Sequence, residues 1–255
     1  MAVPRRLLAR LAIVAVAAVG LLYGGVLLYT QVLNDAPDAL DADDLAAALD
    51  VTTSTSTATV ATLPASPDTT TTLAVADGIE NDTASSWTID AGSSVGYRVA
   101  EVLFGVNTEG VGRTDTVTGG ITIVDQTLTE ASFEVDVASI TSDDGRRDNQ
   151  FRGRIMDAAT FPTANFALTE PVALGLDIVD EATVDIDIIG SLTLRGVTRE
   201  VTASVTARVA SGRIGILGSI PVVFTDFDIV DPSIPGITVE PDGLVEFVLV
   251  LSPVQ

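Results

Sequence analysis

The feature that most constrains the fold of this chain is an alternation of apolar and polar residues that recurs through residues 87–255. Phe133, Val135 and Val137 alternate with acidic residues, and every second residue of 201–209 is Val or Ala. A period of two puts the apolar side chains on one face of a strand and the polar ones on the other, which is typical of antiparallel sheets with one wet face. The pattern therefore predicts an all-β domain.

Seven or eight such segments follow one another, separated by Gly, Asp and Pro. This many one-sided strands can form a sandwich or a closed barrel, and closure removes the edge strands that would otherwise aggregate. Residues 148–159 break the alternation. Phe151, Ile155 and Met156 within this stretch predict one short helix beside the strands.

The interior of an eight-stranded barrel is either filled by side chains or holds one small ligand, depending on the volume of the inward residues. In the strand 201–209 the inward face includes Ala203 and Ala207, and many other inward positions are Val. This thin filling favours an apolar cavity. Composition alone leaves a close-packed core as an open alternative.

The N-terminal segment, residues 1–33, has the composition of a membrane anchor. Arg5, Arg6 and Arg10 precede a run without charges over residues 11–34, and acidic residues follow it. A helix of that length spans roughly 36 Å at about 1.5 Å per residue, enough to cross a ~30 Å hydrocarbon core. The arginines predict a cytoplasmic N-terminus and an extracytoplasmic C-terminal domain. A cleaved signal peptide is the alternative, and it would export the domain as well.

Residues 34–86 are predicted to be a disordered linker. They contain ten acidic residues and no basic residue, and residues 51–73 consist mainly of Thr, Ser, Ala and Pro. Such a segment buries too little apolar surface to offset its ordering entropy. As a flexible coil it would reach roughly 40 Å and hold the domain of residues 87–255 clear of the membrane. A short acidic helix over residues 41–49 is compatible with the sequence but not required by it.

The absence of three residue types excludes many functions. The chain contains no Cys and no His, and all thirteen of its basic residues are Arg. Disulfides, thiolate or imidazole catalysis, Cys or His metal ligands and lysine Schiff bases are therefore excluded. A net charge of -22 argues against nucleic acid as a partner. We expect a binding protein and not an enzyme.

Two groups of charged residues are candidate binding sites. Four arginines between residues 146 and 154 form a basic cluster in an acidic domain. They could hold an anionic head group, or they could pair with the Asp residues of the same stretch, which we favour. The three Asp residues of 226–231 lack the spacing of an EF-hand, so we expect no metal there.

Four motifs follow one another in the domain: YRVAE at 97–101, RDNQFR at 147–152, FPTANF at 161–166 and GSLTLRGVT at 190–198. Their order and spacing resemble the YceI-like family of polyisoprenoid-binding proteins, and the last motif is the most specific. The resemblance implies an eight-stranded, lipocalin-like antiparallel barrel, exported from the cytoplasm, with a long isoprenoid chain in its lumen. Family members commonly carry His where Glu101 and Gln150 stand here, so the contacts to a head group differ in this chain.

We therefore expect a membrane-tethered extracytoplasmic protein that sequesters or carries an isoprenoid lipid, such as a polyprenyl carrier or an isoprenoid quinone. A cell-surface structural or interaction module with a packed barrel is the alternative, and a carboxylate-based glycoside hydrolase is a third. Whether the domain forms a homodimer is open. The residues predicted to line the lumen and contact the ligand are Tyr97, Val99, Ile121, Ile123, Phe133, Val135, Phe166, Val184, Ile186, Val201, Val205 and Phe247, with Phe151, Ile155 and Met156 closing one end.

Overall fold

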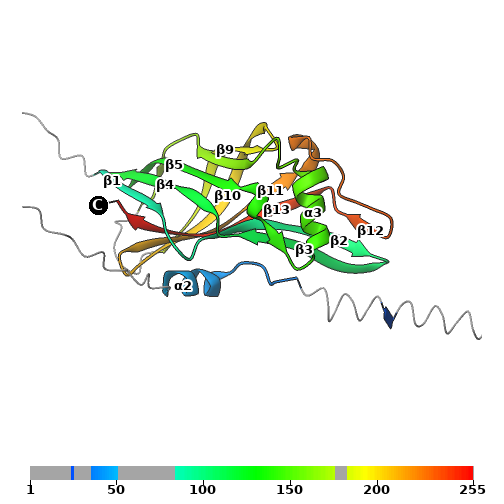
Figure 1. The fold of residues 1–255 in the computed structure, drawn as a ribbon. Helices are drawn as coiled ribbons and strands as arrows, with labels where there is room; N and C mark the ends of the chain where they lie inside the picture. Colours follow the sequence, from blue (N-terminus) through cyan, green and yellow to red (C-terminus); the bar gives the residue numbers. More distant parts are fainter. Residues whose placement is uncertain (1–23, 26–35, 51–83, 176–182, 255) are drawn as a thin grey trace, which may run out of the picture.

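The computed structural model describes residues 24–25, 36–50, 84–175 and 183–254. Residues 84–175 and 183–254 form an elongated β-barrel, and residues 36–50 carry a short helix on its outside (Figure 1). The longer strands are β9 (Thr183–Leu194), β10 (Val197–Ala210), β11 (Arg213–Val223) and β13 (Asp242–Pro253). The other strands are β1 (Ala84–Ile89), β2 (Ser94–Leu103), β3 (Val106–Thr114), β4 (Val117–Val124), β5 (Thr127–Asp136), β6 (Thr141–Ser142), β7 (Thr163–Leu168), β8 (Val172–Ala173) and β12 (Ile237–Val239).

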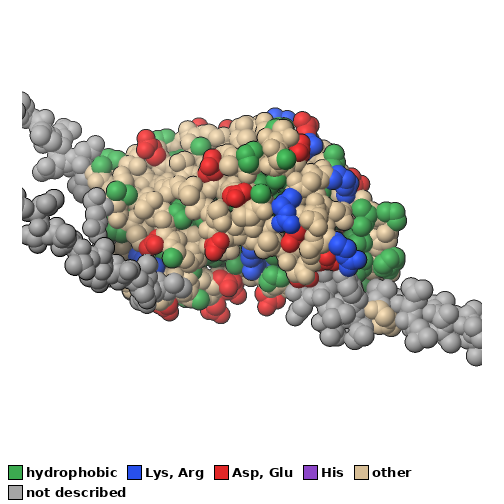
Figure 2. All heavy atoms as spheres, viewed as in Figure 1, with side chains coloured by type: hydrophobic (Ala, Val, Ile, Leu, Met, Phe, Trp, Pro, Cys, Tyr) green, Lys and Arg blue, Asp and Glu red, His purple; other side chains and the backbone are tan. Residues whose placement is uncertain are grey.

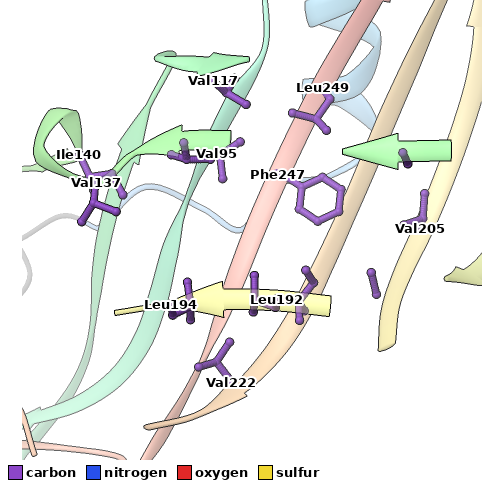
Figure 3. Close-up of a cluster of buried hydrophobic side chains, with 14 of the residues drawn as sticks. Val95, Val117, Val137, Ile140, Leu192, Leu194, Val205, Val222, Phe247 and Leu249 are labelled. Carbon is purple, nitrogen blue, oxygen red and sulfur yellow. The ribbon is translucent and has the colours of Figure 1, made fainter. Parts of the chain in front are cut away.

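Eight strands close the barrel in the order β1-β4-β5-β7-β9-β10-β11-β13, and every neighbouring pair is antiparallel. The ring closes where the end of β13 pairs with β1, as in the register Trp87↔Pro253. The predicted all-β, eight-stranded antiparallel barrel is therefore confirmed, and the sandwich is excluded. The apolar faces that the alternation defined point inward, as Val205, Phe247 and Leu192 do in Figure 3.

The two ends of the barrel are built differently. The first half of β13 pairs with β2 instead of β1, and β2 continues into β3 and β6. The helical segment α3 (Gly145–Gln150) with its π-helical turn η3 (Phe151–Ile155) packs beside β6 and joins this wall. This part of the barrel ends in the β2–β3 turn, β12 and the 3-10 turn η4 (Phe224–Phe227), and we call it the rim end. The other end carries β1 and the β10–β11 turn.

The short helix differs from the predicted range 148–159. It begins at residue 145 because the carboxylate of Asp144 accepts a hydrogen bond from the backbone N–H of Arg146, 2.8 Å away, and so caps the first turn. It ends at Ile155, and Asp157 then takes a positive φ of 49°, which α-helical residues do not adopt.

Part of the predicted linker is ordered. Within residues 34–86, helix α2 (Ala42–Asp50) lies along the outside of β11 and β13 and buries Leu45 and Leu49. The helix is capped by Asp41, whose carboxylate accepts from the N–H groups of Asp43 and Asp44. The two leucines fit because Gly215 offers no side chain: a Cβ there would lie 2.7 Å from Leu45. Residues 36–50 therefore depart from the expected disorder.

The strand under α2 already carried a sign of this contact. Val248 and Val250 of β13 point away from the lumen, yet their exposed fractions are 2% and 0% because the helix covers them. The composition of residues 34–86 did not predict this contact, because composition averages over the whole segment. A nine-residue helix needs only one apolar stripe to dock on a preformed surface.

A buried ionic cluster ties the segment before α2 to the barrel wall. The guanidinium of Arg98 donates to Glu246 at 3.1 Å and also pairs with Glu109, while Arg113 donates to Glu246 at 2.7 Å. Arg98 and Arg113 then donate to the backbone carbonyls of Pro37 and Asp38, at 2.8 and 2.7 Å. The chain is thus fixed to β2 and β3 at residues 37–38.

The predicted membrane anchor over residues 1–33 lies outside the described residues except for Gly24 and Gly25. Among the helices that the structure describes, none is both long and apolar enough to cross a membrane. Residues 51–83 of the predicted linker are also outside the described part. The division into anchor, linker and domain stays a prediction there.

Candidate functional site

The barrel encloses an apolar cavity of about 810 Å³, which is the candidate ligand site. Its walls come from all the long strands and from α3 and η3, and they consist mainly of Val, Ile, Leu, Ala and Phe side chains. A cavity of this volume lies within the range of ~300–1,000 Å³ found for small-molecule sites. The interior is therefore hollow, as the small inward residues Ala203 and Ala207 predicted. The alternative prediction of a close-packed core is wrong.

Fourteen of the fifteen residues predicted to line the lumen border this cavity. The exception is Val201, which points inward but is covered. Val201 pairs with Gly190 on β9, and the ring of Phe166 lies over Gly190, where a Cβ would come within 2.3 Å of it. The aromatic ring therefore stands between Val201 and the cavity. Whether the bordering residues contact a ligand stays a prediction; they are Tyr97, Val99, Ile121, Ile123, Phe133, Val135, Phe151, Ile155, Met156, Phe166, Val184, Ile186, Val205 and Phe247.

The cavity is long and narrow. On β9 the bordering residues extend from Thr183 to Leu194, the whole length of the 12-residue strand. That is roughly 36 Å along the strand at ~3.3 Å per residue, or about 28 Å along the barrel axis if the strands tilt by ~40°. Spread over that length, 810 Å³ leaves room for one chain and not for a bulky globular ligand.

Charged residues border the cavity at the rim end. Glu101, at the end of β2, is 8% exposed, and its Oε1 accepts a hydrogen bond from Arg147 of α3 at 3.0 Å. Arg147 also pairs with Asp143. Burial lowers the pKa of Arg147, but the carboxylates of Glu101 and Asp143 outweigh this, and the net shift of its pKa is upward. The guanidinium is therefore charged and held between two carboxylates.

Polar and aromatic groups surround this ion pair. Gln150 borders the same cavity as Glu101, so both of the positions at which this chain departs from the family motif face the cavity. The ring of Tyr97 stacks on Phe151 with centroids 4.7 Å apart. Burial raises the pKa of the Tyr97 phenol, so it remains a neutral hydroxyl at physiological pH. This end of the cavity offers hydrogen-bonding groups above an apolar tube.

The arginines of residues 146–154 have several roles. Arg146 pairs with Asp144 at 3.4 Å, in agreement with the preferred prediction of local ion pairs. Arg152 donates to the carbonyl of Ile140, and Arg154 donates to those of Asp231 and Pro232, both at 2.8 Å. Asp148, expected in the ion pairs, instead accepts from the hydroxyl and N–H of Ser142.

Among the described residues, no group of three or more Asp or Glu side chains is arranged so that it could hold a metal ion. Asp226, Asp228 and Asp231 are among these described residues. The carboxylate of Asp231 accepts a hydrogen bond from the N–H of Ser233 at 2.8 Å. Hydrogen bonding from the side chain of Ser233, and then from its N–H, holds the pKa of Asp231 below its ordinary value.

Sequence reasoning missed several residues that border the cavity at the rim end. Phe104, Phe224, Ile229 and Ile234 lie in turns and loops, where no periodic pattern assigns a face. Phe104 had one signal that was not used: it is followed by Gly105 directly after the predicted strand of Val95, Tyr97 and Val99, which puts a large apolar residue where hairpin turns favour Asn or Asp.

Comparisons with known proteins agree with this geometry. The family model described as a YceI-like domain matches residues 87–251. A polyisoprenoid-binding domain from Saccharophagus degradans, implicated in plant cell wall breakdown, has 19% sequence identity and a TM-score of 0.53 over 65% of this chain and 97% of its own. BcnA from Burkholderia cenocepacia has 22% identity and a TM-score of 0.50 over 64% of this chain and 98% of its own. The likeness to these two structures concerns the fold. Among curated proteins the comparison finds no match.

Proposed function

Because this chain belongs to the YceI-like family, we propose that it is a membrane-tethered, extracytoplasmic protein that carries a long-chain isoprenoid lipid in its barrel. The observation that carries this proposal is the long apolar cavity of about 810 Å³. Each Å² of apolar surface that a prenyl chain exposes to water costs roughly 25 cal/mol of free energy. It leaves a bilayer only for a container that buries it equally well, and a tube of aliphatic and aromatic side chains does so.

The cavity volume sets the scale of the interaction. At about 30 Å³ for each non-hydrogen atom, close to the volume of a water molecule in the liquid, 810 Å³ holds about 27 atoms. Large ligands gain about 0.3 kcal/mol per non-hydrogen atom, which gives about 8 kcal/mol and a Kd near micromolar. A tail longer than about five isoprene units would then project beyond the barrel. This affinity suits a carrier that must also release its ligand.

The charges at the rim end favour a neutral head group. Arg147 is held between Glu101 and Asp143, and Arg146 is paired with Asp144, so the carboxylates beside the cavity outnumber the two guanidiniums. A diphosphate would meet net negative charge there. A quinone-like or alcohol head instead finds hydrogen-bonding partners in Gln150 and Arg147. We therefore propose a neutral isoprenoid, with its head at the rim end and its tail toward β1.

The first experiment identifies the ligand directly. The full chain, expressed with its N-terminal segment and purified in mild detergent, is extracted with organic solvent and analysed by mass spectrometry. A prenyl lipid that co-purifies in a fixed ratio to protein is the expected result. A protein that yields only the bulk phospholipids of the host would overturn the proposal.

A matched pair of variants locates the lipid in the lumen. Val205 is 7% exposed and borders the cavity, whereas Thr202 is exposed on the outer face of the same strand. Val205→Arg should abolish co-purification of the lipid, and Thr202→Arg should leave it unchanged. Circular dichroism checks that both variants fold. A folded Val205→Arg variant that retains its lipid would place the ligand outside the lumen.

A further inference from the structure

Large apolar side chains gather, exposed, at the rim end of the barrel. Phe104, Val230 and Ile234, which we call the apolar rim, have exposed fractions of 61%, 40% and 37%. With Val223, they account for four of the seven exposed large hydrophobic residues among those that the structure describes. Figure 2 shows hydrophobic side chains grouped at this end of the molecule, with arginines beside them.

Two of the three residues of the apolar rim border the cavity. Phe104 and Ile234 border the cavity and are also exposed to solvent. Pro232, which lies between Val230 and Ile234 in the sequence, borders the cavity as well. The same side chains therefore continue the apolar lining outward to the surface. A lipid that enters or leaves at this end passes over them.

The exposure of Phe104 is imposed by the backbone. Phe104 and Gly105 form the turn between β2 and β3, and Phe104 takes a positive φ of 47°, which is uncommon for a bulky residue. Its N–H donates to the carbonyl of Gly236 at 2.8 Å, and its ring lies over Gly236. The fold thus holds an aromatic ring at its tip in a conformation that Asn or Gly would adopt more easily.

The loop that carries the other rim residues is held in place from both sides. Arg154 of η3 donates to the carbonyls of Asp231 and Pro232 at 2.8 Å, and Arg195 of the β9–β10 turn donates to that of Asp228. A surface that is fixed before it meets a partner loses little entropy on binding.

The described chain is fixed to the barrel wall directly after the predicted anchor. Only residues 35 and 36 separate the clamped Pro37 from the uncharged run 11–34, so a run embedded in a membrane would keep this clamp within about 14 Å of the bilayer. From α2 the described chain runs through Asp38 and Pro37 toward the rim end (Figure 1). Residues 36–50 therefore do not act as a long spacer.

We propose that the apolar rim inserts into the surface of the lipid bilayer, so that the cavity opens directly onto the membrane. Phe and aliphatic side chains enter the boundary between head groups and acyl chains, and the exposed Arg154, which donates to the backbone carbonyls of Asp231 and Pro232, lies at the level of the lipid phosphates. The isoprenoid then moves between bilayer and lumen without crossing water. This inference rests on the proposed membrane anchor but not on the identity of the ligand.

The absence of Cys from the chain makes the test simple. Phe104→Cys and Val254→Cys each introduce a single thiol for the environment-sensitive fluorophore NBD. Val254 is the matched control, because its exposed fraction of 59% nearly equals that of Phe104 but it lies at the opposite end. The full chain is reconstituted in vesicles of phosphatidylcholine and phosphatidylglycerol that contain a doxyl-labelled phospholipid as quencher.

At position 104 we expect a blue-shifted emission that is quenched in proportion to the mole fraction of doxyl lipid. At position 254 we expect the emission of a probe in water and no quenching. Equal behaviour at both positions would overturn the proposal, and so would a chain that does not associate with the vesicles. A blue shift at 104 without quenching would also overturn it, since the rim would then face a second copy of the chain or fold into its own cavity.

A doxyl lipid bound inside the lumen is distinguished by its concentration dependence. Quenching from the lumen saturates at a low quencher fraction and is lost in Val205→Arg, whereas quenching from the bilayer rises steadily and persists in that variant. Loss of quenching in Val205→Arg would assign the signal to the lumen and refute docking. Because the lipid-extraction experiment identifies the ligand without reference to docking, the two proposals can fail independently.

Discussion

Filling the lumen with one aromatic ring tests both the cavity and the ligand site. Ala203 is 2% exposed, lies on the inward face of β10 and borders the cavity. Ala203→Phe adds six carbon atoms to a space that holds about 27 non-hydrogen atoms of ligand. If the ring displaces an equal number of ligand atoms at ~0.3 kcal/mol each, binding weakens by about 2 kcal/mol, or roughly 30-fold.

The same substitution should stabilise the ligand-free protein. Moving a Phe side chain from water into an apolar space contributes about 2 kcal/mol when no neighbour must shift. In a core without the cavity, it would instead cause overpacking and cost about 1–3 kcal/mol. The expected combination of weaker binding and higher stability is therefore specific to a hollow lumen.

Both quantities can be measured on the full chain in lipid nanodiscs. Unfolding in urea is followed by the fluorescence of Trp87, the single tryptophan of the chain, and binding by titration with a fluorescent prenyl probe. Thr202→Phe is the control, because Thr202 is exposed on the outer face of the same strand and the added ring stays in water. A destabilised Ala203→Phe variant with unchanged affinity would refute the cavity as the ligand site.

Three further predictions concern the outside of the barrel. Leu49→Ala removes a side chain that is 5% exposed between α2 and β11, so it should lower the free energy of unfolding by about 2–3 kcal/mol and speed the hydrogen exchange of residues 42–50. The control Asp43→Ala changes an exposed side chain and should have neither effect. Unchanged exchange in Leu49→Ala would mean that α2 does not depend on this contact. Glu246→Ala leaves the buried guanidinium of Arg98 without its bidentate partner and should cost about 3–5 kcal/mol in urea unfolding, whereas a loss below about 1 kcal/mol would contradict a buried cluster. The hydrogen bond from the N–H of Arg146 lowers the pKa of Asp144 below its ordinary 3.8, so the stability that this cap contributes is complete above about pH 4 and is lost as the pH falls through the lowered value. Asp144→Asn should remove that part of the acid dependence of α3, which NMR can measure. Identical acid profiles of variant and parent would show that the cap does not cause this dependence.

The period of two was sufficient to predict an all-β antiparallel domain and most of its interior residues, whereas the choice of a barrel over a sandwich rested on the closure of edge strands and on the family resemblance. Inward and outward residues alternate along every strand, so once one face is apolar its members must share the lumen. This is why residues as distant in sequence as Tyr97 and Phe247 could be assigned to one cavity. The volume of the lumen followed from the same face, because Ala203 and Ala207 leave space that Leu or Phe would fill.

Among the strands longer than three residues, β1, β3 and β11 were not singled out, and each for a physical reason. β3 and β11 are interrupted by glycines such as Gly110, Gly112 and Gly215, which carry no side chain to mark a face. β1 is short and is recognisable mainly by Trp87 and Ile89. Whether such a segment forms a strand depends mainly on the neighbouring strands with which it pairs, so its own sequence predicts it only weakly.

Charge pairing was the other limit. The sequence shows that Glu101, Arg147 and Asp143 are present, but their meeting beside the cavity depends on the placement of α3 against the end of β2. The choice between a diphosphate and a neutral head group rests on that meeting. The covering of Val248 and Val250 by α2 is similar, since their apolar character was visible but the helix that covers them lies about 200 residues earlier in the chain.

The sequence by itself determined the face on which each strand residue lies, an apolar face with small inward residues, and the lack of histidine and thiol chemistry, while its motifs favoured a barrel over a sandwich. Only the tertiary structure decided that this barrel is hollow, where the charges beside its cavity pair, and how residues 36–50 attach to its wall. The physical reason is that alternation is a local property of the backbone, whereas turns, caps and buried ion pairs depend on contacts between segments far apart in the chain.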